Sequence, residues 1–137
     1  MYLADKIDSL ILTLKNQTCF NDVKIIKAYP FVNKPTNLEK IVITVSPSGL
    51  NADNISVGQN YYFGSYMIDF DVFSPQELGS PVVASTIESI ILTLRKFNPS
   101  AIKVEPISIN SNVKCYTAKC TLSFSGEIDF GGDNYGN

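Results

Sequence analysis

Histidine is absent from this chain of 137 residues, and only three cysteines are present. The lack of histidine removes the usual general base near neutral pH and the commonest ligand of transition metals. It also excludes a serine or threonine triad, because the hydroxyl would have no imidazole partner. We therefore expect a protein that is not an enzyme and that uses no cofactor.

Cysteine is too scarce and too irregularly spaced to suggest a disulfide framework or a zinc site. Cys19, Cys115 and Cys120 are an odd number, and no Cys-x-x-Cys spacing occurs. If their segment is a strand, Cys115 and Cys120 point to opposite faces of the sheet. We expect three reduced thiols that are mostly buried.

Long apolar runs and a strong charge of either sign are also lacking. No apolar run approaches the roughly 20 residues of a membrane span, and none near the start has the length of a signal peptide. The net charge is −2 and 45% of the residues are hydrophobic, which excludes disorder and the basic balance of a nucleic-acid binder. We expect one domain at residues 1–130, a flexible tail at 131–137, a cytoplasmic location and no contact with a membrane.

Two stretches eighty residues apart are similar amphipathic helices. Residues 8–15 and 88–95 are identical at five of eight positions. Ser80 is expected to cap the second helix and Asn98-Pro99 to end it. The two apolar stripes are Leu3, Ile7, Leu10, Ile11 and Leu14, and Val83, Ile87, Ile90, Ile91, Leu94 and Phe97. Duplication and shared packing on one sheet both explain the repeat; the match extends no further, so we favour shared packing.

Segments of alternating polarity predict five strands, at residues 23–29, 40–46, 61–73, 102–109 and 113–130. The last segment has the most regular alternation, and its core-facing residues are Tyr116, Ala118, Cys120, Leu122, Phe124, Ile128 and Phe130. The element order is helix, three strands, helix, two strands. This order predicts an α+β fold with a mainly antiparallel sheet and two amphipathic helices packed on one face.

Two long connections separate the first three predicted strands. Residues 30–39 contain two prolines, and residues 47–60 are rich in serine, glycine, asparagine and aspartate, with Leu50, Ile55 and Val57 between them. A loop of 14 residues inside a compact domain is usually functional or disordered. We therefore expect residues 47–60 to form a functional loop.

Acidic residues are concentrated in the second half of the chain. Residues 61–137 hold five basic and eight acidic residues, net −3, whereas residues 1–60 are net +1. Asp69 and Asp71 share one face of the third strand about 7 Å apart, a spacing open to a metal or an acid–base pair. We favour a solvated face that repels phosphate, or that serves solubility alone, over a small metal-dependent module that uses the two aspartates.

Three apolar or edge positions suggest contacts between subunits. Leu12 and Leu92 occupy equivalent places in the middle of the two polar helix faces. They are either a subunit contact or a coincidence of composition, because a patch is more informative than single residues. Pro106 interrupts the fourth strand, where it is tolerated at a sheet edge or a bulge, and edges are where sheets join.

Three segments in a fixed order resemble a known family. Residues 66–75 (YMIDFDVFSP) are followed by residues 79–81 (GSP) and a long amphipathic helix, then by a turn and residues 119–128 (KCTLSFSGEI). This arrangement resembles the tail-terminator, or tail-completion, proteins of tailed bacteriophages and phage-tail-like particles. The N-terminal helix and the chain length also fit, so the resemblance covers nearly the whole chain.

The resemblance implies an α+β subunit of a homo-oligomer, usually a hexameric ring, at the head-proximal end of the tail tube. Such a ring stops polymerisation of the tube protein and joins the tube to a head–tail connector or collar. It implies assembly in the cytoplasm of a bacterial host and a final location in the particle. Another neck or head–tail joining protein is the alternative.

The resemblance also suggests which residues face the lumen and which meet a partner. Family lumens are acidic, so that DNA passes through without specific binding. The acids that would serve this role here are Asp69, Asp71, Glu127 and Asp129. The loop at 47–60 corresponds to a loop or hairpin that reaches a neighbour or the tube, with Leu50, Ile55 and Val57 as its contacts.

Overall fold

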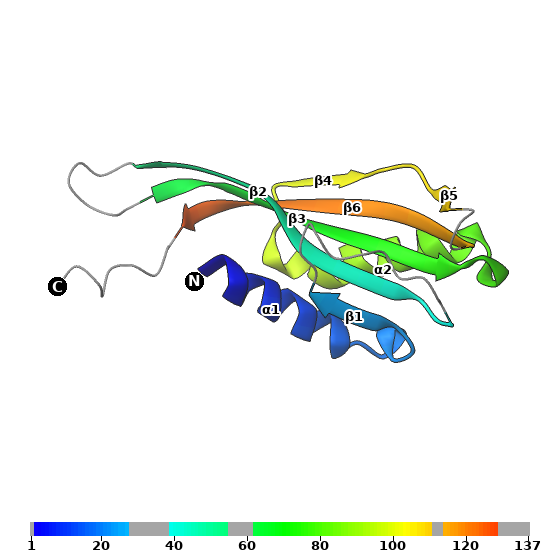
Figure 1. Ribbon diagram of the computed structural model, residues 1–137. Helices are drawn as coiled ribbons and strands as arrows, with labels where there is room; N and C mark the ends of the chain where they lie inside the picture. The colour runs from blue at the N-terminus through cyan, green and yellow to red at the C-terminus, as the bar shows by residue number, and fades with distance from the viewer. Residues whose placement is uncertain (1, 28–38, 55–61, 111–113, 129–137) are drawn as a thin grey trace.

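The computed structural model describes residues 2–27, 39–54, 62–110 and 114–128 of the chain. Within them the elements are α1 (Tyr2–Lys15), β1 (Lys24–Lys27), β2 (Val42–Asn54), β3 (Tyr62–Pro75), α2 (Ser80–Leu94), β4 (Ala101–Val104), β5 (Ser108–Asn110) and β6 (Cys115–Ile128), shown in Figure 1. Short 3-10 turns follow α1, β3 and α2 at Thr18–Phe20 (η1), Gln76–Leu78 (η2) and Arg95–Phe97 (η3). The predicted α+β class is confirmed.

The strands form one mixed sheet in the order β1-β2-β3-β6-β4, and β5 also pairs with β6. β1 lies parallel to β2, and the other described pairs are antiparallel. β3 is the centre of the sheet. It pairs with β6 over its whole length, from Tyr62 opposite Ile128 to Pro75 opposite Cys115, and with β2 over nearly as much.

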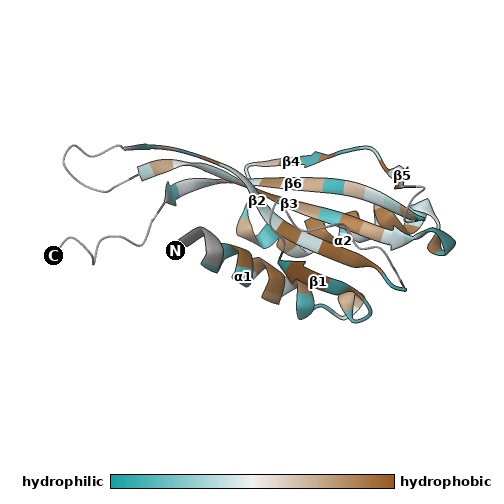
Figure 2. Cartoon of the chain, viewed as in Figure 1, coloured by the Kyte–Doolittle hydropathy of each residue, from teal (hydrophilic) through white to brown (hydrophobic). Residues whose placement is uncertain are grey.

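Both helices cover the same face of the sheet (Figure 1). α1 contacts β1 and β2, α2 contacts β3 and β6, and the two helices contact each other. The strongest hydrophobic colouring lies on the helices and on the adjoining parts of the sheet (Figure 2). The two predicted stripes supply this core with Ile7, Leu10, Ile11, Leu14, Val83, Ile87, Ile90 and Leu94, while Ile91 and Phe97 are half-buried at its margin. The side chain of Leu3 lies outside the described residues.

Alternation along β3 and β6 decides which side chains enter the core. Successive strand residues point to opposite faces, so the even-numbered residues of both strands point to the helices. Their buried apolar members are Tyr66, Ile68, Phe70, Val72, Ala118, Cys120, Leu122 and Phe124. The alternation predicted for the last strand is confirmed at these positions; the side chain of Ile128, and Phe130 as a whole, lie outside the described residues.

The Lys6 side chain of α1 lies against two aromatic rings, one from η3 and one from β6. Its Nζ lies 4.5 Å from the ring centroid of Phe97 and 5.4 Å from that of Phe124. The Phe124 ring stacks on Tyr66, with centroids 5.4 Å apart. Burial lowers the pKa of the Lys6 ammonium group, and the two ring faces stabilise its charge.

The region expected to be a loop at 47–60 is largely strand, because β2 continues to Asn54. A bulge between Pro47 and Gly49 accommodates the proline, and pairing with β3 then resumes. Glycine, asparagine and aspartate have low strand propensity, but the partner strand supplies the hydrogen bonds that outweigh it. The loop prediction was therefore wrong for residues 47–54, and residues 55–60 lie outside the described residues.

Two element boundaries also differ from the predictions. Gly79 takes the N-cap position of α2 with φ 83°, and Ser80 is the first helical residue, so the expected Ser80 cap was wrong. The reason is the preceding turn, which closes through a hydrogen bond from the Gly79 N–H to the Gln76 carbonyl and needs a positive φ that glycine adopts readily. The fourth predicted strand is divided into β4 and β5 around Pro106, as expected for a bulge.

The strands β2, β3 and β6 continue past the end of the helical layer, beyond the N-terminus of α1 (Figure 1). We call this three-stranded extension the arm; it comprises residues 51–54, 62–65 and 125–128. At its start, Gly64 pairs with Ala52 on one side and Gly126 on the other. A Cβ atom on Gly64 would lie 1.9 Å from the backbone oxygen of Asn51, so only glycine allows this approach of β2 and β3.

Substitutions at two adjacent residues of β3 can test which face of the sheet each side chain occupies. Ile68 is fully buried and Met67 is 39% exposed on the opposite face. We expect Ile68→Ala to lower the free energy of unfolding by about 2–5 kcal/mol, because it leaves a cavity in the core. Met67→Ala is the matched control and should cost less than about 1 kcal/mol. Equal losses for the two variants in urea denaturation would contradict the assigned register.

Candidate assembly surfaces

The sheet face opposite the helices is polar along the middle of β3 and β6, and we call it the polar face. Near the Pro75 end of β3 it also carries a buried apolar cluster of Val42, Phe73 and Cys115. It carries the odd-numbered residues of β3 and β6 and their partners on β2. On these three strands the described residues place four carboxylates and one lysine on this face, net −3 (four negative charges, one positive): Asp53, Asp69, Asp71, Glu127 and Lys119. Most of the other side chains on β6 here are hydroxyls, namely Thr117, Thr121, Ser123 and Ser125.

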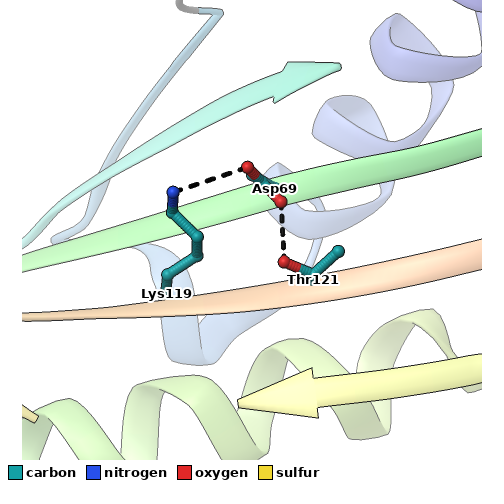
Figure 3. A network of polar contacts seen from close by, with 3 residues as sticks. All are labelled: Asp69, Lys119 and Thr121. Atoms are coloured by element: carbon teal, nitrogen blue, oxygen red, sulfur yellow. Dashed lines mark hydrogen bonds and ion pairs between the residues drawn. The ribbon is translucent and has the colours of Figure 1, made fainter. Parts of the chain in front are cut away.

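Asp69 is held in place by two groups of the neighbouring strand (Figure 3). Its Oδ1 accepts a hydrogen bond of 2.7 Å from Thr121 Oγ1, and its Oδ2 lies 3.6 Å from Lys119 Nζ. The Asp69 side chain is only 14% exposed. A mostly buried carboxylate that is hydrogen-bonded and ion-paired within the sheet is suited to a structural role rather than a metal or acid–base role.

The described acids expected to line a lumen lie on the same face of the sheet but do not form one cluster. Asp69 and Asp71 are on adjacent outward-facing positions of β3, while Glu127 pairs with Phe63 near the end of the arm. Glu127 is six residues from Thr121, the partner of Asp69, which is roughly 20 Å along a strand. Asp129 lies outside the described residues. Among the described residues, no group of three His, Cys, Asp or Glu residues is placed to hold a metal ion.

The arm and its base expose large apolar side chains. Leu50, a predicted contact residue, is exposed on the helix side, opposite Tyr66 in the register. Phe63 and Met67 are exposed on the polar face, and Phe63 is 49% accessible. The sequence places these two residues on that face but does not reveal that Phe63 lies on an extension past the helices. The other predicted contacts, Ile55 and Val57, lie outside the described residues.

A groove of about 260 Å³ lies between α2 and the β4–β5 edge of the sheet. Its lining is apolar except for one glutamate and comprises Ala84, Ile87, Glu88, Ile91, Leu92, Val104 and Ile107. Ile102 and Ile109 are also exposed along this edge. The groove was not predicted from the sequence, although the alternation in residues 102–109 was its signal: a strand with one apolar face and no helix of its own to cover it.

The structure gives Leu12 and Leu92 different roles. Both are exposed as expected, Leu12 at 60% and Leu92 at 51%. Leu92 lines the groove, whereas Leu12 is not among the groove residues. Their equivalent places in the two helices therefore do not produce equivalent surfaces.

The three cysteines form no disulfide, but they are not equally buried. Cys115 and Cys120 are buried, whereas Cys19 is exposed in η1, so the expectation of mostly buried thiols fails for this one. A 3-10 turn at the surface presents its middle side chain to solvent, and Phe20 is the residue of this turn that enters the core. Burial, with a smaller contribution from the Asp69 carboxylate, raises the pKa of the Cys120 thiol to about 11.

Comparison with known proteins supports the fold and adds no function. No protein-family model matches the chain, and no curated protein sequence matches it. Nineteen chains of solved structures match. One of them, a protein whose name states no function, superimposes with a TM-score of 0.54 and 12% identity over 93% of this chain and 95% of that chain. At this identity the likeness shows a shared fold alone. No helix in the described ranges has the length and apolarity needed to cross a membrane.

A double-mutant cycle tests the contact that holds Asp69. We expect Asp69→Ala and Thr121→Val to show a coupling of about 1–2 kcal/mol in the free energy of unfolding, because the hydrogen bond has a charged acceptor and is partly buried. Thr117→Val is the control, since Thr117 pairs with Phe73 further along β6. Its effect should add to that of Asp69→Ala. Additivity in both cycles would rule out the contact.

The Cys120 thiol predicts a pH dependence of stability. Its pKa is raised from an ordinary value of 9.0 to about 11 in the folded state, so the neutral thiol is favoured by folding. The resulting stability is complete below pH 9, is lost as the pH rises towards 11, and amounts to a decrease of about 1 kcal/mol at pH 10. Urea denaturation of Cys120→Ala should lack this decrease. Cys19→Ala should retain it, and a decrease that persists in Cys120→Ala would refute the assignment.

Proposed function

We propose that this chain is the subunit of a ring that terminates the tail tube of a tailed bacteriophage or phage-tail-like particle. The proposal rests on the resemblance of its element order and strand patterns to tail-terminator proteins. It is a structural function without catalysis. The ring, usually hexameric in that family, binds the last layer of tube protein and presents a different surface to the connector or collar.

The observation that carries the proposal is the arm. A three-stranded extension that leaves the helical layer has little core of its own, and it still exposes Phe63 and, at its base, Leu50 and Met67. Isolated exposed apolar residues are common, but an exposed aromatic side chain on a projecting element, with two more exposed apolar side chains at its base, is typical of a surface completed by another chain. Two partners are available in the proposed assembly, the next subunit and the tube protein.

The polar face is the surface that we assign to the lumen. Its charge is −3 on β2, β3 and β6 and −1 when Lys24 of β1 and Lys103 of β4 on the same face are included, so any repulsion of the DNA phosphates comes from the three central strands. Asp69 is fixed by Thr121 and Lys119, so it is a poor ligand for ions that accompany DNA. A lumen with a fixed negative charge and many hydroxyl groups lets DNA pass without specific contacts.

Tube assembly in vitro tests the function. We expect the purified protein, added to polymerising tube protein of the same particle, to stop elongation, because its ring occupies the growing end. Electron microscopy should show shorter tubes with one extra ring at a single end. A chain that forms rings and binds the connector, but leaves tube length unchanged, would be a neck protein instead. A chain that remains monomeric at high concentration and binds no tube would refute the proposal.

A further inference from the structure

Two neighbouring strands are buried on both faces at one end of the sheet. Residues 42–45 of β2 and residues 72–75 of β3 are all buried, so the alternation of exposed and buried side chains stops there. A strand that is buried on both faces has protein packed against each side. The helices cover one face, and the buried side chains on the polar face show that this end of the sheet is covered there as well.

We call the buried polar-face side chains at this end the covered patch. Its members are Val42, Thr44, Phe73 and Cys115, with Ile26 half-buried at its margin.

Three residues of β3 provide an internal comparison. Phe63, Met67 and Phe73 point to the same face, and each has a paired strand on both sides. Phe63 is 49% exposed and Met67 is 39% exposed, whereas Phe73 is 6% exposed. Because pairing within the sheet is common to all three, the low exposure of Phe73 comes from a part of the chain that lies over it.

The helices do not lie over this patch. Among the described elements, those that pack on the faces of β2 and β3 are α1 and α2, and both lie on the opposite face (Figure 1). The cover therefore comes from a segment outside the described residues. The candidates are residues 28–38, 55–61, 111–113 and 129–137.

Two of these segments start too far away. Residues 129–137 follow Ile128, which pairs with Tyr62, eleven residues along β3 from Phe73. That separation is roughly 36 Å, and nine residues span at most about 32 Å when fully extended. Residues 55–61 join Asn54 to Tyr62, which pair with each other at the same distant end, so the chain must also turn back within seven residues.

A third segment reaches only the margin of the patch. Residues 111–113 join Asn110 to Lys114, beside Cys115. Thr44 lies two strands away, since it pairs with Asp71 on β3, and Asp71 pairs with Lys119 on β6. Two strand spacings amount to about 10 Å, and Lys119 is a further four residues along β6 from Cys115. A link of three residues does not cover Thr44.

The connection between β1 and β2 has to cross one face of the sheet. The two strands are parallel neighbours, with Lys24 opposite Val42 and Lys27 opposite Val45. The chain leaves β1 at Lys27 and must return along the sheet to enter β2 at Val42, a crossover that takes a dozen or more residues. Residues 28–41 are available for it. Because α1 occupies the helix side of β1 and β2, the polar face is the side left for this crossover.

We propose that residues 28–38 cross the polar face and pack on the covered patch. Lys34 is the one charged residue of this segment, and two prolines give it a restricted backbone that needs no strand pairing. Its apolar and aromatic residues are Ala28, Tyr29, Phe31, Val32 and Leu38. The proposal goes beyond the ring function and does not depend on it. It leaves the middle of β3 and β6, together with the arm, as the part of the polar face that is open to a partner.

The reactivity of a thiol placed in the patch measures the cover. In a Cys19→Ser background, Thr44→Cys introduces a side chain of similar size at a buried position of the patch. We expect maleimide to modify this thiol about tenfold or more faster when residues 29–34 are replaced by six Gly and Ser residues. Cys120 is buried on the helix side and should stay protected in both proteins, which shows that the rest of the fold is intact.

Replacement of residues 55–60 by the same Gly and Ser residues is the matched control. These residues lie at the other end of β2, so the thiol of Thr44→Cys should remain protected. Protection that survives the replacement of residues 29–34 would refute the proposal. Equal exposure by the two replacements would also refute it.

Nuclear magnetic resonance of the unaltered protein tests the same contact without a risk of unfolding. We expect nuclear Overhauser effects between the methyl groups of Val42 and protons of residues 28–38. Met67, which lies on the same face outside the patch, should show none to this segment. If Val42 shows no such effects, or shows them only to residues 111–113, the proposal is wrong.

Discussion

The central strands are about twice as long as the helices that cover them, and the exposed surfaces of the molecule follow from this difference. β3 and β6 each contain 14 residues and span about 46 Å at 3.3 Å per residue. α2 contains 15 residues and spans about 22 Å at 1.5 Å per residue. The helices therefore bury one part of the sheet, and the remaining length of the strands becomes the arm.

No described helix covers the β4–β5 edge, so its apolar side chains on the helix side remain exposed. Its backbone, in contrast, is protected from pairing with a strand of another chain. An exposed edge strand is open to pairing with another chain, and natural proteins block it with proline, charge or a bulge. Here Pro106 lacks an N–H donor and lies at the bulge, and Lys103 and Glu105 add charge on either side of Val104. Strand addition is disfavoured along this edge, whereas side-chain packing into the groove is not.

Alternating polarity predicted the faces of β3 and β6 correctly, because one face is buried and a shift of one residue would expose every core side chain. The length of β2 escaped prediction, since Gly49, Asn51 and Asp53 are poor strand formers and only the pairing with β3 keeps them extended. The groove could not be predicted from the sequence for another reason. Whether Ile102 and Val104 are covered depends on the strand order and on which strands each helix contacts, and neither is encoded in local periodicity.

The direction of the arm relative to the rest of the sheet is set where the arm begins. The arm leaves the helical layer at Gly64, where β2 approaches so closely that a Cβ atom would overlap the Asn51 backbone. Gly126 lies opposite Gly64 on β6 with φ 149°, so two glycines face each other where the arm begins. Strand segments without side chains twist and bend more readily than their neighbours. The direction in which the arm leaves the helical layer is therefore governed by the twist at this pair of glycines.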